Sequence, residues 1–256
     1  MSIASKAFNI TEAVECGSLV QSAYARYTNA SGKNPWMVPD GYKLEQELHV
    51  TEDAKSLPFG FIASKGGTYS IVFRGTQTPL EWLDDASIEP AAFVTGWGTT
   101  TRGFLTLFDQ IAGQIKSWWP PKNPGPLCIT GHSLGGAIAN LCAAWLFQDH
   151  PTVYTFSAPR CGDPVFAAGF KQQVPNAWRV FNTEDLVPTL PEATILSGAD
   201  GGLLGLSDSV VELAVKLRLQ GKLAFQHVDR PIAVTFNTST LTGNHDLGNL
   251  LKAIQA

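Results

Sequence analysis

The sequence is poor in cysteine, in methionine and in charge. Its 256 residues include four cysteines, two methionines and 16% charged residues. The cysteines have none of the close-pair spacings of a zinc site, and four are too few for a disulfide scaffold in a chain of this length. We therefore expect no metal site, and we expect free, buried thiols at Cys16, Cys128, Cys142 and Cys161.

Further absences concern partners and location. The net charge is −4 and no run of Lys or Arg is of the kind that binds phosphate backbones, so we expect no nucleic-acid partner. No stretch approaches the roughly 18 consecutive apolar residues of a transmembrane segment, so we expect none. The N-terminus shows no basic region followed by an apolar one, so the chain as given shows no signal peptide. A mature secreted enzyme with a new initiating Met would look the same, and we favour that form slightly over a cytoplasmic protein.

The sequence is 44% apolar, a proportion typical of globular proteins, and its apolar residues follow patterns that predict alternating strands and helices. Because no repeat or linker divides the chain, we expect one α/β domain, residues 1–256, with a mostly parallel sheet. Apolar runs predict strands at 60–64, 68–75, 127–130, 152–156 and 178–182, the first two as a hairpin. Helical spacing predicts a first helix with Thr11 as its N-cap and further helices over 103–119, over 134–147, from Ser209 to about Leu219 and after His245. Two apolar runs on either side of Arg230-Pro231 predict a second hairpin.

One motif carries a specific chemistry. Gly131-His132-Ser133-Leu134-Gly135 matches G-x-S-x-G directly after a predicted strand and at the start of a predicted helix, which is the context that gives this pattern its meaning. A sharp strand-to-helix turn strains its corner residue and pushes the Ser133 hydroxyl outward, and the flanking glycines avoid a clash. The Leu134 backbone N–H would then lie where a tetrahedral oxyanion develops. The alternative is a glycine-rich turn with an incidental serine.

A serine hydroxyl becomes a good nucleophile only beside an imidazole that a carboxylate orients. In α/β-hydrolases the acid and then the histidine follow the serine in the chain, which disfavours His49, His132 and His150. His227 and His245 remain, and we prefer His245 because it lies in a turn before the last helix. For the acid, Asp185 follows a predicted strand, with Glu184 and Asp163 as rivals.

Several segments together resemble the class 3 lipases, the fungal-type triacylglycerol lipase family, which also includes feruloyl esterases. The similar segments run in family order from about residue 68 to the C-terminus. They are Val72 to Thr76 with Trp82 and Asp85, Gly131 to Ala137, Tyr154 to Arg160, Asn182 with Asp185, Val187 and Pro188, His227-Val228, and His245 before a terminal helix.

The resemblance implies an α/β-hydrolase fold and the roles of individual residues. It implies that Ser133, Asp185 and His245 form a catalytic triad, and that His227 is structural. It also implies that the backbone N–H groups of Thr76 and Leu134 form an oxyanion hole, with Asp85 tethering the Thr76 hydroxyl. The chemistry of such a site requires no metal and no organic cofactor.

The resemblance further implies a lid over approximately residues 79–97. Its apolar residues could hide an acyl-binding groove in water and turn toward a lipid–water interface in transient contact. An ordinary irregular loop is the alternative. The residues expected to face lipid or substrate are Leu80, Trp82, Leu83, Ile88, Phe93 and Trp97.

We therefore predict a carboxylic ester hydrolase that acts through an acyl-enzyme on an ester or lipid substrate, foremost a triacylglycerol lipase. An esterase for soluble or aromatic, feruloyl-type esters is the nearest alternative. A catalytically silent, hydrolase-like binding protein is more distant, because such a protein would be expected to lack a member of the triad or the oxyanion residue.

Overall fold

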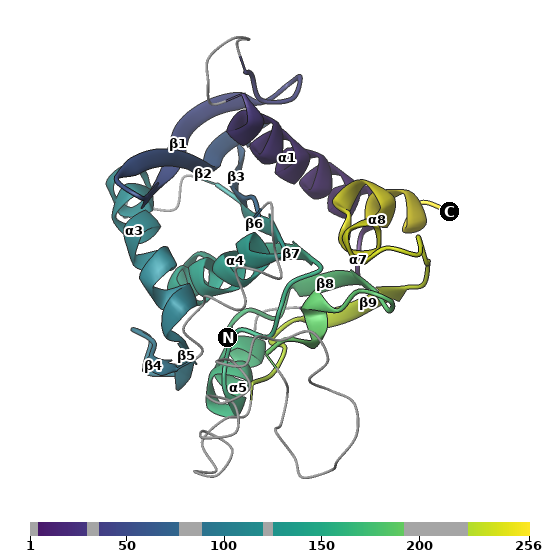
Figure 1. Ribbon diagram of the computed structural model, residues 1–256. Coiled ribbons are helices and arrows are strands. Elements are labelled where there is room, and N and C mark those ends of the chain that lie inside the picture. The colour runs from purple at the N-terminus through teal and green to yellow at the C-terminus, as the bar shows by residue number, and fades with distance from the viewer. Residues whose placement is uncertain (1–4, 30–35, 77–88, 120–124, 192–224) are drawn as a thin grey trace.

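The computed structural model describes residues 5–29, 36–76, 89–119, 125–191 and 225–256 (Figure 1). The predicted helix at 209–219 lies outside these ranges. So do five residues predicted for the lid and the oxyanion hole: Leu80, Trp82, Leu83, Asp85 and Ile88.

The described residues form a seven-stranded sheet in the order β1-β2-β3-β6-β7-β8-β9. The first three strands are antiparallel neighbours, and from β3 to β9 every pair is parallel. Strands β4 (Pro90–Ala92) and β5 (Thr99–Thr101) form a separate short antiparallel pair. The strands of the large sheet are β1 (Lys43–Glu52), β2 (Lys55–Lys65), β3 (Thr68–Phe73), β6 (Leu127–His132), β7 (Thr152–Phe156), β8 (Ala177–Asn182) and β9 (Arg230–Val234).

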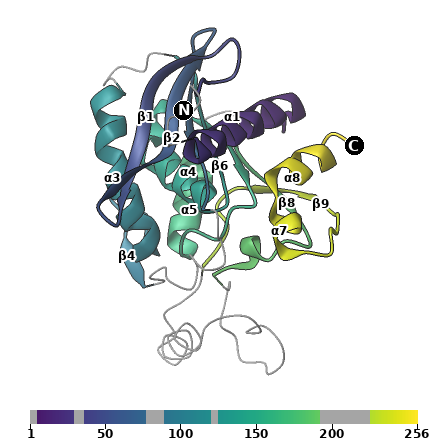
Figure 2. The ribbon, with the colours of Figure 1, turned by 45° about the horizontal axis from the view of Figure 1, so that its top comes forward.

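Helices cover both faces of this sheet. Helices α1 (Ile10–Thr28) and α8 (Leu247–Ala253) lie side by side on one face, and α3 (Arg102–Trp118), α4 (Leu134–Trp145) and α5 (Pro164–Gln173) lie on the other (Figure 2). Short helical turns occur at η1 (Phe147–Asp149), η2 (Val187–Thr189) and α7 (Leu241–His245). None of the helices in the described ranges is long and apolar enough to span a membrane.

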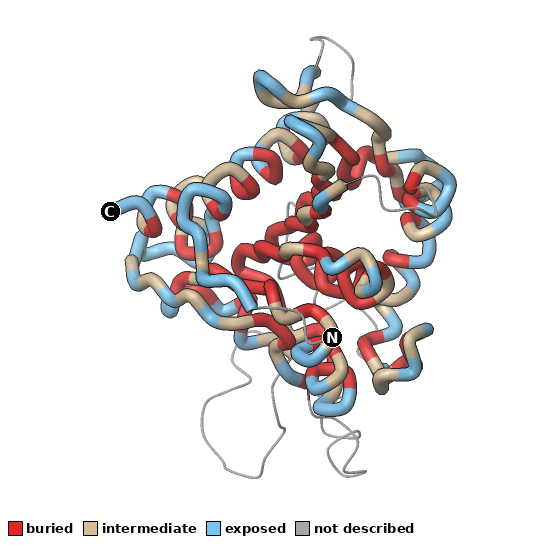
Figure 3. Tube along the Cα trace, turned by 180° about the vertical axis from the view of Figure 1, so that it is seen from behind, coloured by how far each residue is buried: buried red, intermediate tan, exposed pale blue. Residues whose placement is uncertain are grey.

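The core consists of two apolar clusters separated by the sheet. Successive residues of the central strands alternate between them: Ile71 and Phe73 face α3 and α4, whereas Val72 faces α1. Because the central strands are buried on both faces of the sheet, their sequences are continuous apolar runs. Helix α4, which packs on the sheet, is itself buried along most of its length (Figure 3). The predicted α/β class with a mostly parallel sheet is confirmed.

Several predicted boundaries were wrong. Asn9, and not Thr11, caps α1, because the Asn9 carboxamide oxygen accepts the N–H groups of Thr11 and Glu12. Strand β1 was missed, since its exposed and half-buried positions give it many polar residues. The hairpin about Arg230-Pro231 does not form, because Gln226 bridges Gly162 whereas β9 pairs in parallel with β8.

The end of the predicted lid that the structure describes belongs to the packed body. Phe93 is 3% exposed, and its ring lies edge-on to Phe166 and tilted against Phe108. Trp97 packs edge-on against Phe147. In the described structure both side chains pack against the apolar cluster on the side of α3, α4 and α5, Phe93 buried and Trp97 half-buried.

Candidate active site

The parallel strands bring the predicted site residues to one edge of the sheet. Thr76 follows β3, Ser133 follows β6, Asp185 follows β8, and His245 lies on α7, which follows β9. The carboxyl ends of parallel strands meet at the same edge, which is where ligand sites of open α/β sheets form.

Ser133 occupies the corner between β6 and α4 with φ 56° and ψ −129°, a backbone conformation that residues other than glycine rarely adopt. The Ser133 N–H donates to the carbonyl oxygen of Phe156 at 2.9 Å and so holds the corner on β7. A Cβ on Gly131 would collide with the carbonyl of Gly135, and a Cβ on Gly135 would collide with the carbonyl of Arg74. Both glycines of the motif are therefore required by close backbone packing.

The segment after β3 runs against this corner. A Cβ on Gly75 would lie 2.8 Å from the Ser133 Cβ, so the backbone leading to Thr76 touches the serine. The Arg74 guanidinium anchors the segment, with Nε donating to the Pro58 carbonyl at 2.8 Å and Nη1 to the Gly75 carbonyl at 2.6 Å. The Thr76 hydroxyl oxygen is buried and has no hydrogen-bond partner within the described part of the chain. Asp85, predicted as its partner, lies outside that part.

Asp185 and His245 form a buried pair 60 residues apart in sequence. The His245 Nδ1 lies 2.7 Å from the Asp185 Oδ2, and the two side chains are 8% and 1% exposed. The other carboxylate oxygen, Oδ1, accepts the Val187 N–H at 3.0 Å. The Nε2 of His245 is buried without a hydrogen-bond partner among the described residues, which leaves it available as a proton acceptor.

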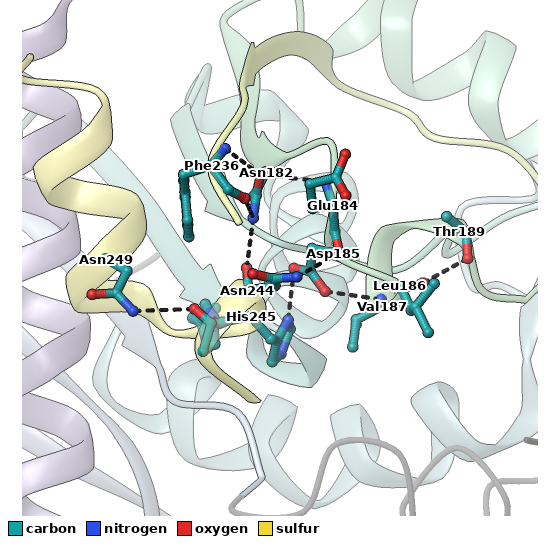
Figure 4. Close-up of polar contacts among 12 residues, drawn as sticks. Asn182, Glu184, Asp185, Leu186, Val187, Thr189, Phe236, Asn244, His245 and Asn249 are labelled. Atoms are coloured by element: carbon teal, nitrogen blue, oxygen red, sulfur yellow. Dashed lines mark hydrogen bonds and ion pairs between the residues drawn. The ribbon is translucent and has the colours of Figure 1, made fainter. Parts of the chain in front are cut away.

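Two asparagines brace the loops that carry this pair (Figure 4). Asn182 is fully buried, and its Nδ2 donates to the carbonyls of Phe236 at 2.9 Å and Asn244 at 3.1 Å. Its Oδ1 accepts the N–H groups of Phe236 and Glu184. The Asn244 Nδ2 donates to the Glu184 carbonyl at 3.3 Å. The residues immediately before Asp185 and His245 are therefore joined directly.

The rival residues have other partners. Asp163 caps α5 and accepts bonds from the Phe166 N–H and from Thr99, while Glu184 is exposed. His227 donates from Nε2 to the Pro188 carbonyl at 2.9 Å, and burial lowers its pKa to about 4, consistent with a neutral structural residue. His49 contacts Ser56 and Glu47 near the start of the sheet.

Sequence reasoning missed two contributors to the site. Asn244, in the turn that carries His245, was not predicted to take part, although its carboxamide also accepts the Thr238 N–H and hydroxyl. Tyr24 lies on α1, 108 residues before the His132 that it contacts. Nothing in the sequence near Tyr24 points to the site, because only the tertiary fold brings α1 to the end of β6. The described residues contain no group of three or more His, Cys, Asp or Glu that could hold a metal ion.

Comparisons with known proteins find sequence similarity to lipases. Residues 70–195 match a family model described as "Lipase (class 3)", a segment that includes Thr76, Ser133 and Asp185. A lipase of Rhizomucor miehei is 33% identical over 138 residues, 49% of this chain and 38% of that protein. "Secreted mono- and diacylglycerol lipase 1" of Fusarium solani is 35% identical over 141 residues, 51% of this chain and 42% of that protein. The matched segments thus span less than half of these relatives.

The fold has a solved counterpart. The structure of the Rhizomucor miehei lipase propeptide complex superimposes with a TM-score of 0.63 at 22% identity, over 93% of this chain and 74% of that chain. At this identity the likeness concerns the fold alone, and it confirms the predicted α/β-hydrolase architecture.

Proposed function

We propose that this chain, which belongs to the class 3 lipase family, is a serine carboxylic ester hydrolase with Ser133 as its nucleophile. The observation that carries the proposal is the imidazole of His245, whose Nδ1 is bound to Asp185 while its buried Nε2 is unpaired among the described residues. A carboxylate on one nitrogen and a free acceptor on the other is the arrangement that general-base catalysis on a serine requires.

The reaction would proceed in two steps. His245 Nε2 removes the proton of Ser133 Oγ as this oxygen attacks the ester carbonyl, and the resulting imidazolium returns the proton to the leaving alcohol. The acyl group is then bonded to Ser133. Water, deprotonated by the same imidazole, releases the carboxylic acid and restores the serine. Asp185 keeps the Nδ1–H of His245 in place throughout and stabilises the imidazolium.

The developing oxyanion would lie between the backbone N–H groups of Thr76 and Leu134. Leu134 is the first residue of α4, so its N–H has no acceptor earlier in the helix. Close packing of Gly75 on Ser133 brings the Thr76 backbone to the same place. Two donors fixed before the reaction stabilise charge without reorganisation, and loss of one typically costs on the order of 3 kcal/mol. Asp85 would hold the Thr76 hydroxyl, whose oxygen is the buried group without a described partner.

We infer that the substrates are acylglycerols. The support is the family, together with relatives named a lipase and a mono- and diacylglycerol lipase. Approximately residues 79–97 would form the lid and would meet a lipid surface transiently through Leu80, Trp82, Leu83 and Ile88, within a single domain of residues 1–256. We also infer secretion, since one relative is named as secreted.

The test is hydrolysis of p-nitrophenyl esters from acetate to palmitate and of emulsified triacylglycerol, by the wild type and by Ser133→Ala. Preference for long chains or emulsion, with activity lost in the variant, is the expected result. Activity confined to short or aromatic esters would assign an esterase in place of a lipase. Activity that survives in Ser133→Ala, or no activity on any ester, would reject the proposal.

A further inference from the structure

The hydroxyl of Tyr24 joins two parts of the site that are distant in sequence. Its oxygen accepts the Gly75 N–H at 2.9 Å and lies 2.8 Å from the Nδ1 of His132. A Cβ on Gly75 would lie 2.5 Å from the same oxygen, so the phenol is pressed against the backbone that leads to Thr76. Tyr24 therefore contacts both the segment before one oxyanion donor and the residue before the nucleophile.

The hydrogen bonds fix the direction of this network. His132 Nε2 lies 2.9 Å from the backbone carbonyl oxygen of His245, which can only accept, so Nε2 carries the proton. In the neutral ring Nδ1 is then an acceptor, and it receives the Tyr24 O–H. Burial, followed by the neighbouring His245, lowers the pKa of His132 well below its usual range, and burial raises the pKa of Tyr24. Both groups therefore keep this protonation at neutral pH.

The neutral state of His132 matters because of its neighbour. The rings of His132 and His245 lie 4.6 Å apart between centroids, tilted by 39°. His245 becomes positively charged in both steps of the proposed reaction, and a charged His132 at this distance would oppose that charge. A neutral His132 removes the opposition, and its Nε2–H holds the backbone of the residue that carries the general base.

We propose that Tyr24 is a positioning residue that acts through His132. Its single hydroxyl holds the Gly75 backbone and fixes the Nε2–H tautomer of His132, so that the oxyanion segment, the nucleophile corner and the His245 backbone keep one relative placement. This inference rests on the proposed ester hydrolysis. It predicts that loss of the hydroxyl slows the chemical step and leaves substrate binding nearly unchanged, since Tyr24 contacts the machinery that serves the transition state.

The first test is Tyr24→Phe, which removes only the hydroxyl. Tyr27→Phe is the matched control, because Tyr27 lies on the same helix and its ring packs on Arg74, 3.8 Å from the guanidinium carbon. We expect kcat on a p-nitrophenyl ester to fall about tenfold or more in Tyr24→Phe, the effect of one lost hydrogen bond of roughly 1.4 kcal/mol, with KM within about twofold of wild type. Tyr27→Phe should match the wild type. A kcat within about twofold of wild type, or a loss confined to KM, would overturn the proposal.

The second test does not depend on hydrolysis and covers the case in which Tyr24→Phe fails to fold. Nitrogen-15 NMR of histidine-labelled wild-type protein reports the tautomer of each ring, and the His132 signals are assigned by their loss in His132→Gln. We expect His132 to be neutral at pH 7 with the proton on Nε2. A charged ring, or a proton on Nδ1, would refute the role of Tyr24 whether or not the protein hydrolyses esters. Conversely, the expected tautomer in a protein without esterase activity would reject the proposed function alone.

Discussion

The buried carboxamide of Asn182 offers a demanding prediction, because Asn182→Asp changes one NH₂ group into an oxygen. In the native protein Nδ2 donates to two backbone carbonyls, and Oδ1 accepts two N–H groups. A carboxylate keeps the second pair of bonds, loses the first and directs a negative oxygen at two carbonyl oxygens. We expect the folded protein to lose about 4 kcal/mol at pH 7, from two lost donors at roughly 1 kcal/mol each and two carbonyls left without a partner.

The measurement is equilibrium unfolding in urea at pH 7 and at pH 5. The aspartate would be fully buried, so its pKa should lie above the usual value. The destabilisation should therefore shrink at pH 5, where the carboxyl begins to bind a proton and regains one donor. Thr183→Ala is the control, since it removes an exposed hydroxyl contact with Thr235 between the residues that directly follow β8 and β9, and it should cost less than about 0.5 kcal/mol. An Asn182→Asp protein within about 1 kcal/mol of wild type at pH 7 would refute the reasoning.

Three further predictions follow from the same structure. Gly135→Ala should destabilise the fold by more than about 2 kcal/mol, because its Cβ would collide with the Arg74 backbone. Gly113→Ala, on the open face of α3, should instead stabilise the fold by about 0.5–1 kcal/mol. Thermal unfolding of both variants distinguishes a backbone collision from a general effect of alanine. Burial lowers the pKa of His227 to about 4 in the folded protein, below the 6.5 of the free side chain, so the folded state binds fewer protons than the unfolded state between these pH values. The free energy of unfolding should therefore be unaffected by this group above pH 6.5 and should fall by up to about 3 kcal/mol toward pH 4. Urea titrations should show a smaller fall in the free energy of unfolding with pH in His227→Gln than in the wild type. Burial raises the pKa of the Cys142 and Cys161 thiols, and Cys16 is also buried. A thiol reagent should therefore label at most the half-buried Cys128 in the folded protein, and all four cysteines in urea. Rapid labelling of Cys142 or Cys161 without denaturant would contradict the packing.

The sequence allowed most of the central sheet to be predicted, for a physical reason. Strands such as β7 are buried on both faces and therefore appear as uninterrupted apolar runs, and the glycines around Ser133 mark a backbone approach that few other residues permit. Strand β1 escaped prediction because its polar, partly exposed residues lack that pattern. The false hairpin at Arg230-Pro231 shows the opposite error, since a turn signal between two apolar segments does not say with which strand each will pair.

The candidate site was predictable in part. The motif around Ser133 fixes the nucleophile position locally, and the turn before the last helix favoured His245 over His227. The choice of Asp185 over Glu184 and Asp163 depended on resemblance to a family, which also supported His245. The structure brings Asp185 and His245 together and gives Asp163 and His227 other partners. The contact of Tyr24 with His132 joins residues that are 108 positions apart in the chain and share no sequence motif, so no local pattern could have predicted it.

The central claim is that Ser133 becomes acylated during ester hydrolysis, and covalent trapping tests it most directly. The wild-type protein is incubated with a p-nitrophenyl phosphonate, whose phosphonyl group is transferred to an activated serine with release of p-nitrophenol. The modified residue is then located by peptide mass spectrometry. We predict stoichiometric release of p-nitrophenol, complete loss of esterase activity and one adduct, on Ser133, with no adduct in Ser133→Ala. An adduct on another residue that accompanies the loss of activity, or esterase activity that persists in fully modified protein, would contradict the account.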